Sequence, residues 1–265
     1  MKVQSQGNLT RQDVRRVVAF LDAMEGAEGT LAEFAGRGVQ ALPMLTSAEL
    51  ITLSICDLRT GRRQVISGQP DALSAAHLSS FDQFFFDHPL VRFHSQNPRG
   101  GAHRISDSLP RGQFQNSPLF NEYYRSIGID HAIAVPLHVD GRTLVSFVLN
   151  RSKVDFTDRE RDILEFVRRY LAQQYRYAQL LGRQRATQEM TVANALFSQF
   201  IPALTPRETE VLNWVVAGKT NPEIAAIVSA GVRTVQKHLE HIFTKLGVET
   251  RTAAAMRALA MRELH

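Results

Sequence analysis

Cysteine and tryptophan are scarce in this sequence of 265 residues, which contains one of each, Cys56 and Trp214. A single cysteine excludes an internal disulfide and a zinc site built from cysteines, and it is typical of proteins in a reducing cytoplasm. No apolar run approaches the ~20 residues that a membrane-spanning helix needs. Residues 1–5 lack the apolar stretch of a signal peptide. We therefore expect a cytoplasmic protein that has no membrane partner.

The sequence also lacks the short motifs that identify most enzymes. Serine, histidine and aspartate are present, but no nucleophile elbow, phosphate-binding loop or metal-binding helix occurs. A metal site formed by His88, His94 and His103 is disfavoured because their spacing matches no familiar ligand pattern. We therefore predict no catalytic residue, no metal site and no cofactor. The net charge of +5 is compatible with a polyanionic partner but does not identify one.

Residues 10–181 contain helical and strand patterns that together predict one α+β domain. Thr10 precedes apolar residues at helical spacing, which predicts a helix to about Gly26, and a second helix is expected over residues 31–42. Strand patterns occur at residues 50–56, 64–67, 132–139 and 144–149. Asp140-Gly141 predicts a tight hairpin turn between the last two. This order favours helices packed against a predominantly antiparallel sheet.

A long helix is predicted after this sheet. Thr157 and Glu160 form the capping-box pattern that begins it. Its stripe alternates in steps of four and three along Ile163, Val167, Tyr170, Gln174, Tyr177 and Leu181. That spacing fits either the seam of a short coiled coil or a helix packed on its own sheet, and the sequence leaves both open. We place the first domain at residues 10–181, a linker at 182–203 and a second domain at 204–265.

The segment from residue 70 to residue 124 is irregular and rich in aromatic residues and histidines. Aromatic clusters usually belong to a core, so a packed aromatic core is the simplest interpretation. Irregular segments of this composition can also line a ligand pocket. For that alternative, the candidate lining residues are Phe84, Phe86, His88, His103, Tyr123 and Tyr124. Cys56, at the end of a predicted strand, is expected to pack in the interior rather than act as a redox switch.

Residues 204–265 contain two helix-start signals in close succession. Thr205-Pro206-Arg207-Glu208 is a capping box with proline at the first helical position, and Gly218 is expected to end that helix in a left-handed conformation. Thr220-Asn221-Pro222-Glu223 is a second capping box. A turn at Ser229-Ala230-Gly231 then leads into a third helix. Its apolar face is formed by Val235, Leu239, Ile242 and Leu246.

The opposite face of this third helix carries the residue types that a helix in the DNA major groove requires. Glutamine pairs with adenine, lysine with guanine, and glutamate accepts from cytosine. The candidate base-reading residues are therefore Gln236, Lys237 and Glu240. A helix N-terminus and nearby polar or basic side chains hold phosphates. The candidate phosphate contacts are Lys219, Thr220, Asn221, Arg233, Thr234 and Lys245. A solvated face in a small helical bundle would show the same pattern.

A resemblance to a known family separates these two interpretations. Residues 204–259 resemble the LuxR-type helix-turn-helix domain of bacterial transcription regulators. The matching residues are Leu204-Thr205-Pro206-Arg207-Glu208, Val211-Leu212, Gly218, Glu223-Ile224-Ala225, Thr234-Val235, His238-Leu239, Lys245-Leu246-Gly247-Val248 and Arg251. The resemblance implies that the third helix enters the major groove and that a fourth helix, residues 252–262, pairs DNA-bound domains. Small residues would allow its close approach: Ala254, Ala255 and Ala258.

The turn before the third helix departs from the family pattern. The family commonly has glycine, a large aliphatic residue, and then serine or threonine there, whereas this sequence has Ser229, Ala230 and Gly231. Glycine at the N-cap makes a helix less stable than serine does, by roughly a few tenths of a kcal/mol. Losing the aliphatic anchor costs on the order of 1 kcal/mol or more. We therefore expect a looser turn with the fold retained.

Residues 10–181 resemble a GAF-like sensor domain in the Val135-Pro136-Leu137 strand, the Asp140-Gly141 turn and the Asp155-Phe156-Thr157 entry to the closing helix. The two resemblances imply a GAF-like helix–antiparallel-sheet sandwich joined by a long helix to an all-α four-helix helix-turn-helix domain. They imply a homodimeric, sequence-specific transcription regulator that binds double-stranded DNA. A small-molecule signal would act on the N-terminal domain and control the DNA-binding domain.

Two alternatives stay open at the level of the sequence. Acyl-homoserine-lactone quorum-sensing receptors combine a similar sandwich with the same type of DNA-binding domain, and His88-Pro89-Leu90-Val91 is similar to their Asp-Pro segment. That family uses tryptophan in its ligand pocket, whereas Trp214 belongs to the DNA-binding part here. The second alternative is a dimeric DNA-binding regulator without a ligand. The sequence predicts neither the ligand nor the target DNA.

Overall fold

The computed structural model describes residues 9–25, 29–69, 72–200 and 204–263. The chain divides into two compact units, Met1–Gly182 and Arg183–His265. The first contains helices and an antiparallel sheet, and the second is entirely helical, so the predicted fold class is confirmed. No helix in the described part of the chain has both the length and the apolar character needed to cross a membrane.

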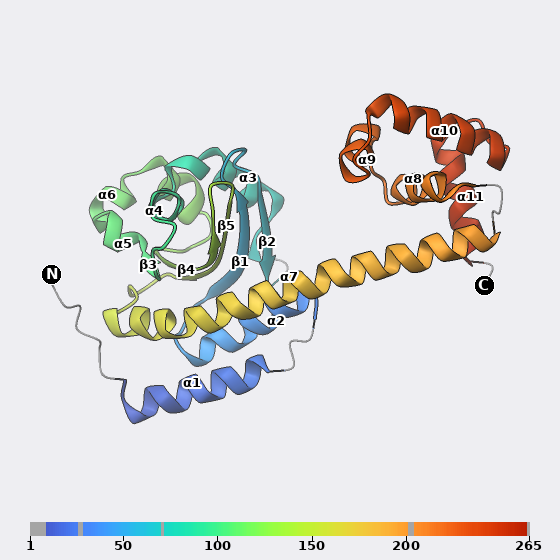
Figure 1. Cartoon of the computed structure of the whole chain (residues 1–265). Helices are drawn as coiled ribbons and strands as arrows, with labels where there is room; N and C mark the ends of the chain where they lie inside the picture. Colours follow the sequence, from blue (N-terminus) through green and yellow to red (C-terminus); the bar gives the residue numbers. More distant parts are fainter. Residues whose placement is uncertain (1–8, 26–28, 70–71, 201–203, 264–265) are drawn as a thin grey trace. The chain divides into compact units, whose positions relative to one another are not determined.

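Five strands form one antiparallel sheet in the N-terminal unit (Figure 1). They are β1 (Leu50–Asp57), β2 (Arg63–Ser67), β3 (His103–Arg104), β4 (His131–Val139) and β5 (Thr143–Arg151), in the order β2-β1-β5-β4-β3. The four predicted strands are confirmed, and the hairpin between β4 and β5 turns at Asp140 and Gly141. β3 is absent from the sequence prediction because two residues are too few to show an alternating pattern.

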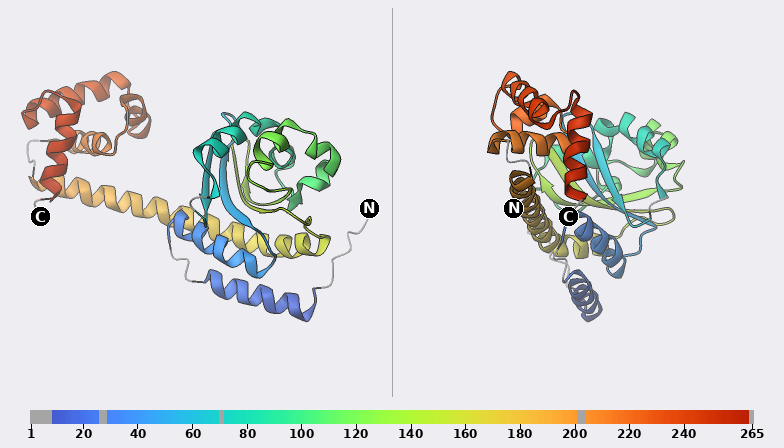
Figure 2. Two further views of the ribbon diagram at one scale, coloured as in Figure 1. Left: turned by 180° about the vertical axis from the view of Figure 1, so that it is seen from behind. Right: turned by 90° about the vertical axis from the view of Figure 1, so that its right-hand side faces the viewer.

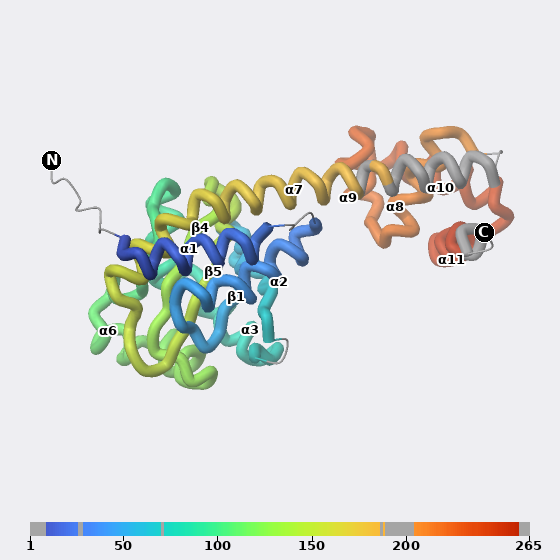
Figure 3. Tube along the Cα trace, turned by 90° about the horizontal axis from the view of Figure 1, so that it is seen from below, coloured from blue at the N-terminus to red at the C-terminus, as the bar shows by residue number. Residues whose placement is uncertain are grey.

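One face of the sheet is covered by helices from both ends of this unit. They are α1 (Arg11–Met24), α2 (Leu31–Ala41), the 3-10 turn η1 (Leu42–Met44) and α7 (Asp158–Phe200). Thr10 caps α1 and Thr30 caps α2, each in a reciprocal capping box with the acidic residue three positions later. Figure 3 shows α1 on the outside of this layer. Gly26, the predicted end of the first helix, lies outside the described residues.

The sheet face toward these helices is uniformly apolar. Its side chains join the helices in one core: Ile51, Leu53, Ile133, Val135, Leu137, Val145, Phe147 and Leu149. Phe147 lies against Phe34 of α2, with 5.6 Å between ring centroids. Gly38 of α2 faces the same ring, because a Cβ atom at this position would lie 2.2 Å from Phe147 Cζ. Glycine at position 38 therefore sets how closely α2 approaches the sheet.

Short helices cover the opposite face of the sheet (Figure 2). They are α3 (Ala75–Gln83), η3 (Phe85–Asp87), α4 (Pro89–Gln96), α5 (Ile105–Ser108), α6 (Arg111–Gln115) and η4 (Phe120–Tyr124). Most aromatic residues of this segment are buried in a second core, which includes Phe81, Phe85, Phe114 and Phe120. The aromatic-core interpretation therefore holds for much of the segment. A cavity lies between this core and the sheet.

The helix α7 packs on its own sheet over its first half. Its buried residues are Ile163, Leu164, Val167, Leu171, Ala172, Tyr175 and Ala178. The proposed coiled-coil seam shares only its first two positions with this stripe, and Tyr177 of that seam is exposed. α7 also stays helical to Phe200, so most of the predicted linker at 182–203 is helix; residues 201–203 lie outside the described part.

Besides the end of α7, the described part of the C-terminal unit contains four helices: α8 (Pro206–Val216), α9 (Asn221–Ile227), α10 (Val232–Leu246) and α11 (Arg251–Glu263). Both predicted capping boxes are formed, and Gly218 has the predicted left-handed conformation, with φ 76°. The prediction that the small residues of α11 allow close approach to another helix is wrong for two of them. Ala254 and Ala258 are fully buried in the core of their own domain, so they do not offer a surface for close approach to another helix.

Candidate functional site

The exposed face of α10 is the candidate DNA-binding surface. Val235, Leu239, Ile242 and Leu246 are buried against α8 and α9. The three predicted base-reading residues, Gln236, Lys237 and Glu240, are all exposed on the other side of the helix. The structure therefore confirms the division of α10 into an apolar and a polar face. It places donors and an acceptor for base edges side by side on a helix that is fixed by its buried side.

The N-terminus of α10 carries the features of a phosphate-binding helix end. Gly231 occupies the N-cap position and provides no side-chain hydrogen bond, and no acidic residue lies in the first turn. Arg233 and Thr234 are both exposed there. The first amides of a helix lack intrahelical acceptors and carry partial positive charge. These groups together suit a negatively charged phosphate oxygen.

The turn between α8 and α9 holds three more of the predicted phosphate contacts. Thr220 is the N-cap of α9, and Lys219 Nζ lies 3.9 Å from Glu223 Oε1. The Asn221 side chain accepts a hydrogen bond of 3.0 Å from Arg251 Nη1, and Arg251 also donates to the carbonyl of Lys219. Asn221 and Arg251 therefore tie the turn to α11, a structural role that the sequence prediction did not assign.

Lys245 is held inside the C-terminal unit by an ion pair. Its Nζ lies 2.7 Å from Oε2 of Glu208, which is almost fully buried and closes the capping box of α8. Burial raises the pKa of Glu208, but hydrogen bonds from Lys245 and Thr205 lower it more, so the net pKa lies below its ordinary value. Because Glu208 occupies the ammonium group, Lys245 is the predicted phosphate contact that the geometry favours least.

The turn before α10 contains a residue in an unusual backbone conformation. Ser229 has φ 52°, the left-handed region that favours glycine. The turn is nevertheless closed, since Ala230 N donates to Ala225 O at 2.9 Å and the Ala230 side chain packs against the core. The chain therefore keeps the turn geometry at a position where the LuxR-type pattern has glycine, at the cost of backbone strain in Ser229.

Ser229→Gly is expected to raise the free energy of unfolding of the C-terminal unit by about 0.5–1 kcal/mol, because glycine adopts this conformation without a Cβ clash. Urea unfolding followed by the fluorescence of Trp214 measures the change, since that is the only tryptophan. Ser229→Ala keeps the Cβ atom and is expected to match the wild type. Equal stability of the glycine and alanine variants would contradict the strain at this position.

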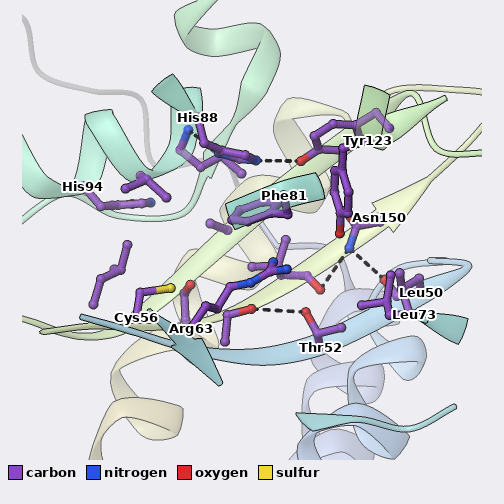
Figure 4. Close-up of a pocket in the computed structure, with 18 residues that line it drawn as sticks. Leu50, Thr52, Cys56, Arg63, Leu73, Phe81, His88, His94, Tyr123 and Asn150 are labelled. Atoms are coloured by element: carbon purple, nitrogen blue, oxygen red, sulfur yellow. Dashed lines mark hydrogen bonds between the residues drawn. The ribbon is translucent and has the colours of Figure 1, made fainter. Parts of the chain in front are cut away.

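A second candidate site is a cavity on the other side of the N-terminal sheet, beneath the short helices (Figure 4). Alternate residues of β1 and β5 face it, and several of them are polar although they are buried: Thr52, Ser54, Ser146 and Asn150. Asn150 is held by its own sheet, where Nδ2 donates to Leu50 O at 3.2 Å. Burying polar side chains on one sheet face is unfavourable without partners, so this face differs from an ordinary core.

His88 and Tyr124 form a hydrogen-bonded pair at the cavity. His88 Nδ1 accepts from the backbone N–H of Leu90 at 3.2 Å, and Nε2 lies 2.8 Å from the Tyr124 hydroxyl. Burial, with a smaller contribution from Arg63, lowers the pKa of His88 to about 3, so the ring is neutral. Its single proton is therefore on Nε2 and is donated to Tyr124. The Tyr124 hydroxyl hydrogen is left to donate to another group.

The structure brings together three of the six predicted pocket residues. His88, Tyr123 and Tyr124 line the cavity. Phe84 packs at the edge of the second core and Phe86 is 56% exposed, so neither lines it. His103 stacks on Phe93 with 3.4 Å between ring centroids and also lies outside the lining. Phe84, Phe86 and His103 fail as lining residues because the irregular segment gave no periodicity from which their direction follows.

The sequence prediction also missed lining residues, of which Arg63, Phe81 and His94 are the main ones. Arg63 is the first residue of β2 and lies opposite Cys56 in the register of β1 and β2. Cys56 is buried in the cavity wall, and burial raises its pKa to about 12, so its thiol stays protonated and unreactive. Among the described residues, no group of three or more potential ligands is arranged to hold a metal ion.

The two units define a helix-turn-helix DNA-binding domain and a helix–sheet domain with an internal cavity. Residues 202–258 match the family model described as bacterial regulatory proteins, luxR family. The spore germination protein GerE of Bacillus subtilis is 41% identical over 63 residues, which cover 24% of this chain and 85% of GerE. Through its C-terminal domain, the chain belongs to the LuxR family.

Longer relatives also match over a limited share of this chain. The transcriptional activator protein AnoR of Acinetobacter nosocomialis is 46% identical over 65 residues, or 24% of this chain and 27% of AnoR. The chain thus spans about a quarter of the length of such curated relatives. The N-terminal fold is similar to the VqsR LBD domain of Pseudomonas aeruginosa, with a TM-score of 0.50 and 13% identity over 63% of this chain and 96% of that one.

Proposed function

We propose that this protein is a cytoplasmic, sequence-specific DNA-binding transcription regulator whose helix-turn-helix domain is controlled by its GAF-like N-terminal domain. The observation that carries the proposal is the exposed polar face of α10, on a domain whose family consists of bacterial regulatory proteins. Gln236, Lys237 and Glu240 read bases. Arg233, Thr234 and the α10 N-terminus bind phosphates, with Lys219 contributing from the preceding turn.

Lys237→Ala is expected to weaken binding to the preferred DNA site about 5- to 150-fold, because a base contact is worth about 1–3 kcal/mol, and to change nonspecific binding little. The preferred site is first selected from random double-stranded DNA by the purified full chain. Fluorescence anisotropy at fixed salt then compares that site with a scrambled duplex. Equal losses on the two duplexes would remove Lys237 from base reading.

Lys219→Ala is the matched control, because a phosphate contact carries no sequence information. It is expected to weaken binding to both duplexes by a similar factor. The slope of the logarithm of the binding constant against the logarithm of the salt concentration should become shallower by about one, because one phosphate contact is lost. Failure to select any sequence, with and without cell extract as a source of signal, would contradict the proposal as a whole.

The same proposal includes a homodimer. Phe166, Tyr177 and Leu180 are exposed large apolar side chains on α7, and half-buried Tyr170 lies between the first two. Positions 166, 170, 173, 177 and 180 alternate in steps of four and three, which is the spacing of a coiled-coil seam. Of these residues, Tyr170 also packs against the core of its own domain. Light scattering of the free and DNA-bound chain tests this part, and a monomer in both samples would contradict it.

The cavity favours a sensor over a regulator without a ligand. Several polar side chains and a guanidinium are buried around this cavity. Burying them costs free energy, and dimerisation alone does not require that cost. The N-terminal domain is therefore proposed to bind a small molecule between its sheet and the short helices. Binding would change how the two DNA-binding domains of a dimer are held on paired half-sites.

A further inference from the structure

The guanidinium of Arg63 is buried at the cavity, and one of its edges makes no hydrogen bond. Its side chain is 6% exposed, and neither Nε nor Nη2 has a hydrogen-bond partner. The nearest carboxylate oxygen, Oδ1 of Asp82, is 4.0 Å from Nε, which is too long for a hydrogen bond, and the Asp82 side chain is 49% exposed. Asp82 therefore offsets part of the charge of Arg63, but the N–H groups of Nε and Nη2 are buried without an acceptor. Burying such donors without a hydrogen bond is unfavourable, so this edge lacks an acceptor.

The Nε and Nη2 edge of a second arginine, Arg168, shows which kind of group such an edge binds. Arg168 donates from Nε to Glu165 Oε2 and from Nη2 to Glu165 Oε1, both at 2.8 Å. Such two-pronged pairing is specific for planar groups with two acceptor oxygens. The free Nε and Nη2 of Arg63 present the identical pair of donors. Phe81 holds them in place, because the Arg63 Cζ lies 3.5 Å from the centre of its ring.

The surroundings of Arg63 limit both the charge and the size of the missing group. Among the described lining residues, Arg63 is the only charged side chain, since burial keeps His88 and His94 neutral with pKa values of about 3 and about 4. A ligand with a single negative charge would complement this one cation of the lining. The space open to the centres of water-sized molecules is about 40 Å³, and one water needs roughly 10–15 Å³ on this measure. Only a small molecule fits without rearrangement.

The rest of the lining supplies further donors and an apolar wall. The Tyr124 hydroxyl has a hydrogen to donate, and both ring nitrogens of His94 are buried without a partner. Leu144 and Val148 provide apolar contacts from the sheet. Inorganic phosphate or sulfate would leave that apolar surface uncovered. A carboxylate attached to a short carbon body would use both parts of the cavity.

We propose that the cavity binds a small organic monocarboxylate, whose two oxygens pair with Nε and Nη2 of Arg63 and whose carbon body lies against the apolar wall. Tyr124 donates a further hydrogen bond to the ligand. This assignment rests on the proposed sensor role of the N-terminal domain and specifies the class of its ligand. It also separates the ligand from acyl-homoserine lactones, which carry no charge to pair with Arg63.

The test is calorimetric titration of the full chain with acetate and butyrate, and with the uncharged amides of the same two acids. Each amide matches its acid in size and differs in charge, so the comparison isolates the contact to Arg63 in the wild-type protein. We expect at least one acid to bind ten or more times as tightly as its amide. Equal binding of acid and amide would overturn the proposal, as would no binding by either acid or by propionate, hexanoate or benzoate up to about 10 mM.

Variants locate the contact. Arg63→Gln is expected to lose the tenfold preference for the acid, while Arg62→Gln, the exposed neighbour, keeps it. Asp82→Asn is expected to bind the acid at least as tightly as the wild type, because it removes the carboxylate that lies 4.0 Å from Arg63 Nε and competes with the ligand. Unchanged acid binding in a folded Arg63→Gln chain would overturn the proposal. If this variant does not fold, the wild-type comparison of acid and amide still decides.

The outcome is separable from the proposed function. Binding of the selected DNA site is measured without any carboxylate, so DNA recognition stands or fails independently. If N-hexanoyl-homoserine lactone binds in the cavity and no carboxylate does, the sensor role stands and the assignment of an anionic ligand is wrong.

Discussion

Gly38→Ala is expected to lower the free energy of unfolding of the N-terminal unit by about 2 kcal/mol, although alanine is the better helix former. The added Cβ would lie 2.2 Å from Phe147 Cζ and 2.8 Å from its Cε1, so something must move. Phe147 is fully buried and is in contact with Phe34, which leaves its ring no free direction. Either the ring leaves its favoured rotamer or α2 moves away from β5.

Gly36→Ala is the matched control on the same helix. A Cβ atom at position 36 has no neighbour within 4 Å, so only the helix propensity changes, and the variant is expected to be more stable than the wild type by about 0.5–1 kcal/mol. The two alanine variants should therefore differ by about 3 kcal/mol. Near-ultraviolet circular dichroism of the tyrosines follows this unit, since all five lie within residues 123–177. Equal stability of the variants would refute the close approach of α2.

The sequence predicts those parts of the fold that depend on local interactions. Thr10, Thr157, Thr205 and Thr220 are all found at the helix starts that their capping patterns indicate. β1, β4 and β5 follow their apolar or alternating residues. Both signals act over a few residues and need no knowledge of the tertiary structure. For the same reason, the division of α10 into a buried and an exposed face could be predicted from helical spacing alone.

The apolar stripe of α7 is a case in which helical spacing alone does not predict which side of a helix is buried. Ile163 and Val167 fit both the predicted seam and the observed packing, and the two stripes separate only further along the helix. A helix that carries apolar residues on two sides gives a period of four and three on either of them. Only contacts with the sheet, through residues such as Leu171 and Tyr175, decide which side is inside.

The cavity could be predicted only in part, because its key residue comes from a distant strand. His88, Tyr123 and Tyr124 stand out as aromatic and histidine residues within one segment. Arg63 precedes the predicted strand at 64–67 and resembles any exposed arginine in the sequence. Its burial follows from the pairing of β2 with β1 and from Phe81 of α3, which are long-range contacts. A buried guanidinium whose Nε and Nη2 lack hydrogen-bond partners is visible only in three dimensions.

Glu208→Ala is expected to lower the free energy of unfolding of the C-terminal unit by about 3 kcal/mol, and this loss should depend on pH. The substitution removes the capping box of α8, worth about 1 kcal/mol, and a charge-assisted hydrogen bond to Lys245, worth about 1.5–3 kcal/mol. His241 Nδ1, 3.7 Å from Oε1, is the other basic group beside this carboxylate. The substitution therefore removes the ion pair between Glu208 and Lys245, which joins α8 to the end of α10.

The sign of the pH dependence follows from the lowered pKa of Glu208. Its folded pKa lies below its unfolded value, so the carboxylate stabilises the fold above the unfolded pKa, and this contribution is lost as the pH falls through the folded pKa. The difference between wild type and Glu208→Gln should therefore be largest near neutral pH and should shrink in acid. Urea unfolding followed by Trp214 fluorescence at several pH values measures it.

Glu210→Ala provides the control for this prediction. Glu210 pairs with Arg207 at 2.6 Å on the same helix, but the two side chains are 33% and 40% exposed, so water screens this pair far more than the one at Glu208. Exposed pairs contribute little, so this variant should lose about 0.5 kcal/mol. If Glu208→Ala were no more destabilising than Glu210→Ala, or if the difference between wild type and Glu208→Gln grew in acid, the buried ion pair would not hold α8 against α10. Lys245 would then be free for the phosphate contact that its place in the sequence suggests.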